Sequence, residues 1–182
     1  RGGNGIHTGY RFLREGQVSI HDDRWLTHPW GVKGGLPGAR SSKMLEKADG
    51  TRTILPAKCD RIKVAPGDIV HFRTWGGGGW GDPFARAPEL VLEDVEGGLA
   101  TIEGAARYGV VIIEADREYS IDSAATEILR DEMREARGND IPLFNKGGSL
   151  DELLARCEED TGLPAPAPPV FPSWVQTDQA AE

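Results

Sequence analysis

The chain contains one unusual glycine run near its middle, Trp75-Gly76-Gly77-Gly78-Gly79-Trp80-Gly81-Asp82-Pro83. Four consecutive glycines leave the backbone free to adopt positive φ angles and to lie against another surface. The flanking tryptophans argue against a flexible linker, because such linkers are rich in glycine and serine and poor in large aromatic residues. We therefore predict a shaped glycine turn in close backbone contact, with positive φ at one or more of the four glycines, ending at Asp82-Pro83.

The composition is that of a small globular protein rich in turn residues. The chain has 182 residues, of which 24 are glycine and 12 are proline, and 38% are hydrophobic. This length suits one domain or slightly more, and the apolar fraction is sufficient for a core. No stretch approaches the roughly 18 apolar residues of a membrane helix, and no signal peptide is visible. We therefore expect a cytoplasmic protein without a membrane partner.

The charge is negative and unevenly distributed. The chain carries a formal net charge of −8, and residues 111–182 alone hold 16 acidic and 6 basic residues. Nucleic-acid binding proteins usually present a basic stripe to the phosphate backbone, and this sequence shows none. The composition therefore argues against a nucleic-acid partner. The excess of acidic residues beyond residue 110 indicates that the chain changes in character near that position.

Residues 1–118 are expected to form a β-rich glycine-loop region. Short runs with alternating or β-branched residues are separated by glycine turns, and Ile69–Thr74 is the strongest of them. Two further short strands are expected at 98–102 and 108–113. These patterns predict an α+β fold in which twisted antiparallel strands come first.

Residues 119–163 are expected to form a helical segment with two helices. Asp122 is a candidate N-cap for a helix from Ser123 to about Arg137, and Ser149 with Glu152 fits a capping box that opens a second helix. Residues 164–182 are expected to form an extended proline-rich tail in which Phe171 and Trp174 act as anchors. The predicted inward faces are Ile121, Ala125, Ile128, Leu129, Glu132 and Ala136 in the first helix, and Leu150, Leu153, Leu154 and Cys157 in the second.

The sequence offers few candidates for chemistry. His21 and Asp23 could share one face of a strand as metal ligands or as a base, but a role in capping a surface turn is favoured. Arg24 and Lys33 flank an aromatic-glycine loop, where they could hold a carboxylate or phosphate or could pair with acidic residues of the chain. No nucleophile motif and no phosphate-binding loop is present, so the catalytic residues remain unassigned. The candidate cleft-lining residues are His7, Arg24, Lys33, Gly77 and Gly78, and no metal ligand is assigned.

Taken in order, the motifs of residues 1 to about 135 resemble the C-terminal part of the large subunit of the hydantoinase B/oxoprolinase family. Relatives in that family include N-methylhydantoinase B and subunits of acetone and acetophenone carboxylase. No single motif is specific, but their order and spacing together are. The residues that carry the resemblance are Arg1–Gly5, Arg24, Pro29–Gly38, Lys58, Pro66–Asp68, Gly79–Pro83, Arg86, Val91, Asp94-Val95, Gly98 and Tyr108–Val111.

The resemblance implies an ATP-dependent assembly. Family members work with a hydantoinase A-type ATP-binding subunit, and they open hydantoin or lactam rings or carboxylate ketones by phosphorylating an otherwise unreactive oxygen. Their divalent metal is held by Asp and His residues of the N-terminal region, which this sequence does not contain. ATP and the metal are therefore expected on partner chains, with none bound by this chain. Because the sequence opens inside a motif at Arg1, we expect it to be part of something longer.

The expected function is that of a C-terminal component of an ATP-dependent amidohydrolase, one that completes a multi-subunit active site and is not active alone. Its partners would be the remaining N-terminal part of a hydantoinase B-type subunit and the ATP-binding subunit. Two alternatives stay open. The chain could belong to an ATP-dependent ketone carboxylase, or it could be a non-catalytic assembly module in which the glycine loops only permit close subunit packing.

Overall fold

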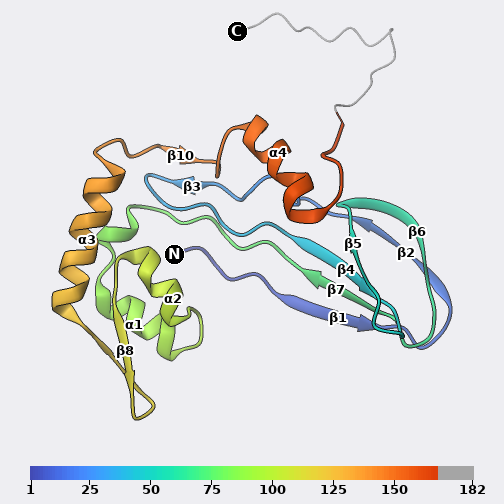
Figure 1. The fold of residues 1–182 in the computed structure, drawn as a ribbon, viewed down its shortest axis with the longest axis horizontal. Helices are drawn as coiled ribbons and strands as arrows, with labels where there is room; N and C mark the ends of the chain where they lie inside the picture. The colour runs from blue at the N-terminus through green and yellow to red at the C-terminus, as the bar shows by residue number, and fades with distance from the viewer. Residues whose placement is uncertain (168–182) are drawn as a thin grey trace, which may run out of the picture.

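The computed structural model describes residues 1–167 and shows two lobes joined by extended segments (Figure 1). One lobe contains a four-stranded antiparallel sheet with the order β1-β7-β4-β5 and a separate antiparallel pair, β2 with β6. Its buried core consists of Ile20, Leu45, Leu55, Val64 and Val70. The strands are β1 (His7–Arg11), β2 (Gly16–His21), β4 (Ser42–Glu46), β5 (Arg52–Leu55), β6 (Lys58–Val64) and β7 (Ile69–Arg73).

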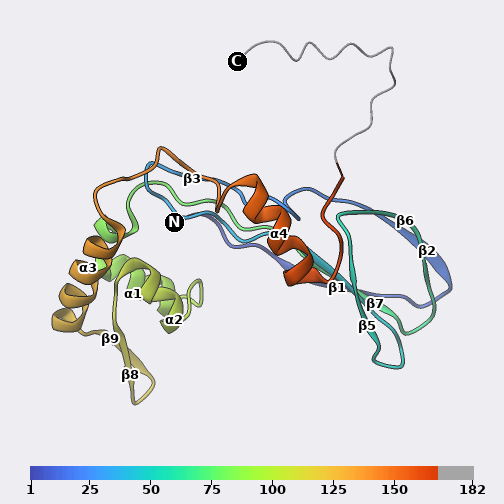
Figure 2. The same cartoon turned by 45° about the horizontal axis from the view of Figure 1, so that its top comes forward.

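The second lobe is largely helical and has its own core. Two helices and a β-hairpin enclose Val91, Val95, Ala105, Val110 and Ile112, and a third helix docks on the lobe through hydrogen bonds of Arg130. Figure 2 shows this lobe standing apart from the sheet. Its elements are η1 (Pro83–Ala85), α1 (Pro88–Glu96), α2 (Ile102–Ala105), η2 (Ala106–Tyr108), β8 (Ile112–Ala115), β9 (Glu118–Ile121) and α3 (Ser123–Arg137).

The α+β class and the antiparallel strands are confirmed, but the expectation of strands alone before residue 118 is wrong. Helix α1 begins with Pro88, and at this first position a helix has no intrahelical hydrogen bond for the missing N–H of proline to break. The helix buries Val91 and Val95, which lie one turn apart. The strand expected at 98–102 is instead a turn that leads into α2, which begins at Ile102 and is capped by the Thr101 side chain. The strand expected at 108–113 forms later, as β8.

The glycine run is extended rather than turned. Gly76, Gly77, Gly78 and Gly79 all lack positive φ, which corrects the prediction made for them, and the first positive φ occurs at Gly81 (80°). The close contact that was predicted is present. The run lies between residues 1–6 and 30–39, with backbone hydrogen bonds from Gly77 N to Gly3 O (2.8 Å) and from Gly79 N to Leu36 O (2.9 Å). Glycine is needed here because neighbouring backbones approach too closely for a Cβ atom.

Helix α3 packs through a face that its apolar pattern did not predict. Thr126 is buried and the side chains of two arginines reach backbone carbonyls of the second lobe, whereas Ile128 is 61% exposed. Arg130 donates to Tyr108 O and Arg86 O, and Arg134 donates to Phe84 O. The predicted inward face is therefore wrong by about one position, because charged hydrogen bonds orient this helix. The predicted cap is confirmed, since the Asp122 side chain accepts from Ala125 N.

Two short strands and a fourth helix complete the described chain. Strand β3 (Gly31–Val32) pairs with β10 (Phe144–Asn145), and α4 (Leu150–Thr161) follows with the predicted capping box. Leu153 and Cys157 are buried as predicted, but Leu150 is 60% exposed. No helix among residues 1–167 is both long and apolar enough to cross a membrane. The tail anchors predicted at Phe171 and Trp174 lie outside the described residues.

An ion pair between Arg137 and Asp82 joins α3 to the end of the glycine run. Because the pair includes a carboxylate, it should make the stability of the fold depend on pH in the acid range. Arg137 donates two hydrogen bonds to Asp82 (2.7 and 3.1 Å), and this pairing lowers the pKa of the Asp82 carboxyl below its ordinary 3.8. A lowered folded-state pKa adds stability above pH 3.8 that is lost as the pH falls through the folded pKa. Asp82→Asn should cost about 1–2 kcal/mol at pH 7 and remove this contribution to acid sensitivity.

Urea denaturation of the wild type and of Asp82→Asn between pH 3 and 7 checks this prediction. Asp140→Asn is the matched control, because Asp140 is exposed and makes no hydrogen bond or ion pair within residues 1–167. Equal losses of stability in the two variants at pH 7 would contradict the assignment.

Candidate functional site

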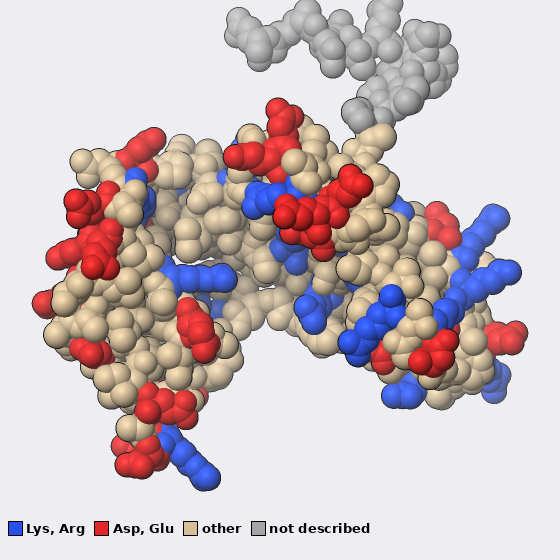
Figure 3. Space-filling model, in the orientation of Figure 1, with Lys and Arg blue, Asp and Glu red and all other residues tan. Residues whose placement is uncertain are grey.

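A cavity of about 660 Å³ lies where the glycine segments meet the helical lobe. One wall is formed by residues 1–5, 35–39, 76–77 and 79–81, and the opposite wall by residues of η1, η2 and the segment before α2. Glycines from all three segments line it, so backbone forms much of its surface. Figure 3 shows a hollow between the two lobes with basic side chains at its edge. A volume of this size is typical of small-molecule sites, which span roughly 300–1,000 Å³.

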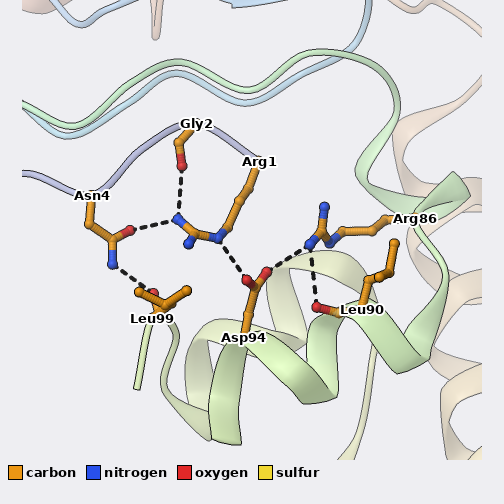
Figure 4. Close-up of polar contacts among 7 residues, drawn as sticks. All are labelled: Arg1, Gly2, Asn4, Arg86, Leu90, Asp94 and Leu99. Carbon is orange, nitrogen blue, oxygen red and sulfur yellow. Dashed lines mark hydrogen bonds and ion pairs between the residues drawn. The ribbon is translucent and has the colours of Figure 1, made fainter. Parts of the chain in front are cut away.

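The cavity wall is organised by one carboxylate that holds two guanidinium groups (Figure 4). Asp94 of α1 accepts from Arg1 Nε through Oδ1 and from Arg86 Nη2 through Oδ2, each at 2.9 Å. Asn4 accepts from Arg1 Nη1 (3.0 Å) and donates to Leu99 O (2.8 Å). These contacts join the start of the chain to the helical lobe and fix both arginines at the cavity.

The charge of the cavity is opposite to that of the chain. Arg1, Arg86 and Arg107 line it together with one acidic residue, Asp82, which is already paired with Arg137. Asp94 is the ion-pair partner of Arg1 and Arg86. The four arginines and two aspartates of the cavity and its ion pairs therefore carry a net charge of +2, in a chain whose net charge is −8. The Arg86 guanidinium also lies 5.9 Å from the ring of Tyr108. The site therefore favours a negatively charged or strongly hydrogen-bond accepting group.

The structure disperses the candidate residues predicted from the sequence. Gly77 lines the cavity, whereas Gly78 faces the backbone of Trp30. Arg24 has a φ of 58° and donates to His28 O (3.3 Å), and Lys33 has a φ of 49° with its ammonium 5.4 Å from the Trp80 ring. Neither basic side chain lines the cavity.

The histidine candidates lie on the sheet lobe. His7 Nε2 is 3.3 Å from His71 Nδ1, and His21 Nε2 is 3.2 Å from Asp60 Oδ1. Asp23 is exposed and does not join His21. Within residues 1–167, no group of three or more His, Cys, Asp or Glu residues is arranged to hold a metal ion.

A buried charge cluster in the sheet lobe was missed entirely from the sequence. Lys43 is fully buried and forms an ion pair with Asp22, and Ser41 Oγ lies 3.1 Å from Lys43 Nζ. Burial lowers the pKa of Lys43 to about 8, and the adjacent carboxylate favours its charged form at neutral pH. Lys43 lies two residues before buried Leu45 on β4 and shares its face. Its partner Asp22 is 21 positions away, so the sequence carried no direct signal for this pair.

Known proteins resemble this chain over part of its length. Residues 1–83 match the family model described as hydantoinase B/oxoprolinase. Residues 1–83 belong to that family. The B component of the putative D-/L-hydantoinase of Pseudomonas sp. strain NS671 is 33% identical over 132 residues, which are 71% of this chain and 22% of that protein. Because 71% of the chain is more than residues 1–83, this similarity extends beyond the hydantoinase B segment.

Two ATP-dependent enzymes are also similar. The crystal structure of the ATP-dependent caprolactamase from Pseudomonas jessenii matches with a TM-score of 0.56 and 28% identity, over 70% of this chain and 22% of that chain. The acetone carboxylase alpha subunit of Xanthobacter autotrophicus is 35% identical over 85 residues, or 44% of this chain and 11% of that protein. The chain spans less than a quarter of the length of the curated relatives that it matches.

The cavity crosses the boundary of the hydantoinase B segment. Arg1 and the glycine wall lie inside the segment, whereas Arg86, Asp94 and Arg107 lie beyond its last residue. Arg1, Arg86 and Asp94 carry part of the family resemblance, but their spacing along the chain did not place them at a site. Their meeting depends on a contact between residues 93 positions apart, which local patterns do not reveal.

Proposed function

We propose that this chain is one component of a cytoplasmic, multi-subunit, ATP-dependent amidohydrolase of hydantoinase B type, which opens hydantoin or lactam rings. The observation that carries the proposal is the extent of the matches. A hydantoinase component and a caprolactamase each align with about 70% of this chain, which is more than the hydantoinase B segment alone. Hydantoin and caprolactam are both cyclic amides, so the names of these two relatives both indicate an enzyme that acts on a ring amide bond.

In this proposal the chain completes an active site that other polypeptides largely supply. The partners would be the remaining part of a hydantoinase B-type subunit and a hydantoinase A-type ATP-binding subunit, and these would carry ATP and the divalent metal. The extended glycine segments support such a role, because they present backbone rather than side chains and allow another surface to approach closely. Arg24 and Lys33 remain proposed contacts to a partner or substrate, outside the cavity.

A component of a ketone carboxylase is the second candidate, and a specific observation favours it. The acetone carboxylase alpha subunit is 35% identical over 85 residues. That match covers 44% of this chain, against 71% for the hydantoinase component, so the amidohydrolase is the better supported proposal. The non-catalytic assembly module is the third possibility, and it predicts turnover that does not depend on this chain.

The reaction type can be tested on the purified assembly that contains this chain. We expect hydantoin, 5-oxoproline or caprolactam to be opened with stoichiometric formation of ADP, in buffer purged of bicarbonate. Product is measured by mass spectrometry and ADP by chromatography. Consumption of acetone or acetophenone that requires bicarbonate, with no ring opening, would contradict the amidohydrolase and support the carboxylase.

A further inference from the structure

We propose that the cavity between the glycine segments and the helical lobe is an oxyanion-binding site, which takes either free phosphate or a small organic anion with a carboxylate group. Arg107 supplies the principal contact, and Arg1 and Arg86 supply a second, preformed pair of guanidinium groups. The choice of carboxylate probes below rests on the proposed function, whereas the site itself rests on the charges and contacts of this chain.

The electrostatics of the cavity favour an anion. The cavity and its ion-pair partners carry a net charge of +2, although the chain as a whole carries −8. A concave, partly desolvated pocket concentrates the field of its lining charges and raises the local concentration of counter-ions. The counter-ion that fits a volume of about 660 Å³ is a small organic anion rather than a macromolecule.

Guanidinium donors remain available at the cavity. Asp94 uses its two oxygens on Arg1 Nε and Arg86 Nη2, and it thereby holds the two groups in fixed positions. Arg86 Nε is buried and has no hydrogen-bond partner within residues 1–167. Arg107 is exposed at the cavity and forms no hydrogen bond or ion pair in the described part of the chain. Guanidinium groups bind carboxylate and phosphate through paired N–H donors, so these groups match an oxyanion.

Apolar side chains of the cavity can contact the rest of the ligand. Leu36, Leu99 and Tyr108 line the same cavity, and the glycine wall has no side chains to exclude a ligand from the backbone. An anion with a short apolar chain could place its charged end on the arginines and its chain against these residues. Two oxyanion sources share this chemistry, a free phosphate and an organic carboxylate, and the experiment separates them.

Binding is measured by isothermal calorimetry on the full chain at about 50 mM NaCl in buffer without phosphate, because salt screens exposed charges. The probes are inorganic phosphate, hexanoate and, as the uncharged match, hexanamide. We expect hexanoate or phosphate to bind, competition between them where both bind, and at least a roughly tenfold weaker interaction with hexanamide. Binding of phosphate alone assigns the site to phosphate, and binding of hexanoate alone assigns it to carboxylates.

Two variants give the result its specificity. Arg107→Ala should weaken anion binding at least about tenfold, and Arg107→Lys should retain part of it. Arg14→Ala, which removes the same charge from an exposed bend outside the cavity, should change binding by less than about twofold. Thermal melts confirm that each variant folds. The proposal is overturned if neither anion binds, if hexanamide binds as well as hexanoate, or if Arg107→Ala and Arg14→Ala behave alike.

This test is separable from that of the proposed function. Ring opening by the assembly, together with no anion binding by the chain, would leave the amidohydrolase standing and remove the site. Anion binding that depends on Arg107, in an assembly that opens no ring, would leave the anion site standing and contradict the amidohydrolase.

Discussion

Gly78→Ala is expected to destabilise the junction between the lobes by about 3 kcal/mol or more, which exceeds the usual cost of overpacking. A Cβ atom on Gly78 would lie 1.8 Å from the Trp30 carbonyl oxygen and 2.4 Å from its carbonyl carbon. Both contacts are with backbone, so no side chain can rotate away to relieve them. The adjacent extended segments would have to separate, and their hydrogen bonds would be lost with them.

Gly3→Ala provides the matched control for this prediction. Gly3 lies in a neighbouring extended segment, and a Cβ atom there would meet nothing within 4 Å. Its stability should change by no more than about 0.5 kcal/mol. Urea denaturation, with the midpoint and slope fitted for each variant, measures both. A Gly78→Ala protein as stable as Gly3→Ala would show that the three segments do not pack as described.

Lys43→Met is expected to cost about 3–5 kcal/mol, because it leaves the Asp22 carboxylate buried without its partner charge. The Lys43 side chain is fully buried and that of Asp22 is 4% exposed, so water cannot replace the lost contact. Ser41 Oγ also donates to Asp22, but one hydroxyl does not neutralise a carboxylate. Methionine fills much of the same volume, so the loss reports on charge rather than on a cavity.

The double variant Asp22→Asn/Lys43→Met should recover part of this loss, since neither charge then remains buried alone. Lys58→Met is the control, because Lys58 is exposed on β6 and its substitution should change stability by less than about 0.5 kcal/mol. If Lys43→Met is no more destabilising than Lys58→Met, the buried pair does not stabilise the sheet lobe.

Local sequence patterns were sufficient for features set by neighbouring residues. The helix cap at Asp122 was predicted from that residue alone and the capping box at Ser149 from Ser149 and Glu152, and both form as expected. The order and spacing of the motifs also predicted the hydantoinase B family, which the match of residues 1–83 confirms. These features depend on spacing along the chain, which a single sequence displays directly.

Features set by contacts between distant residues were not predictable in the same way. The glycine run was expected to turn as well as to lie in close backbone contact, because glycine permits both, and only the neighbouring segments show that an extended run makes that contact. The inward face of α3 was wrong because Arg130 and Arg137 dock on groups far away in sequence. The arginines of the cavity were missed for the same reason, since Arg1 meets Asp94 only in the fold.

The central claim is that this chain completes the active site of a cyclic-amide hydrolase. It is tested most directly by titrating the assembly, prepared without this chain, with the purified chain while ATP-dependent ring opening is measured. We predict negligible turnover at the start and a linear rise to a plateau at one chain per large subunit, with Gly78→Ala giving little or no rise. Full turnover before any chain is added would contradict the claim and leave the chain an assembly module.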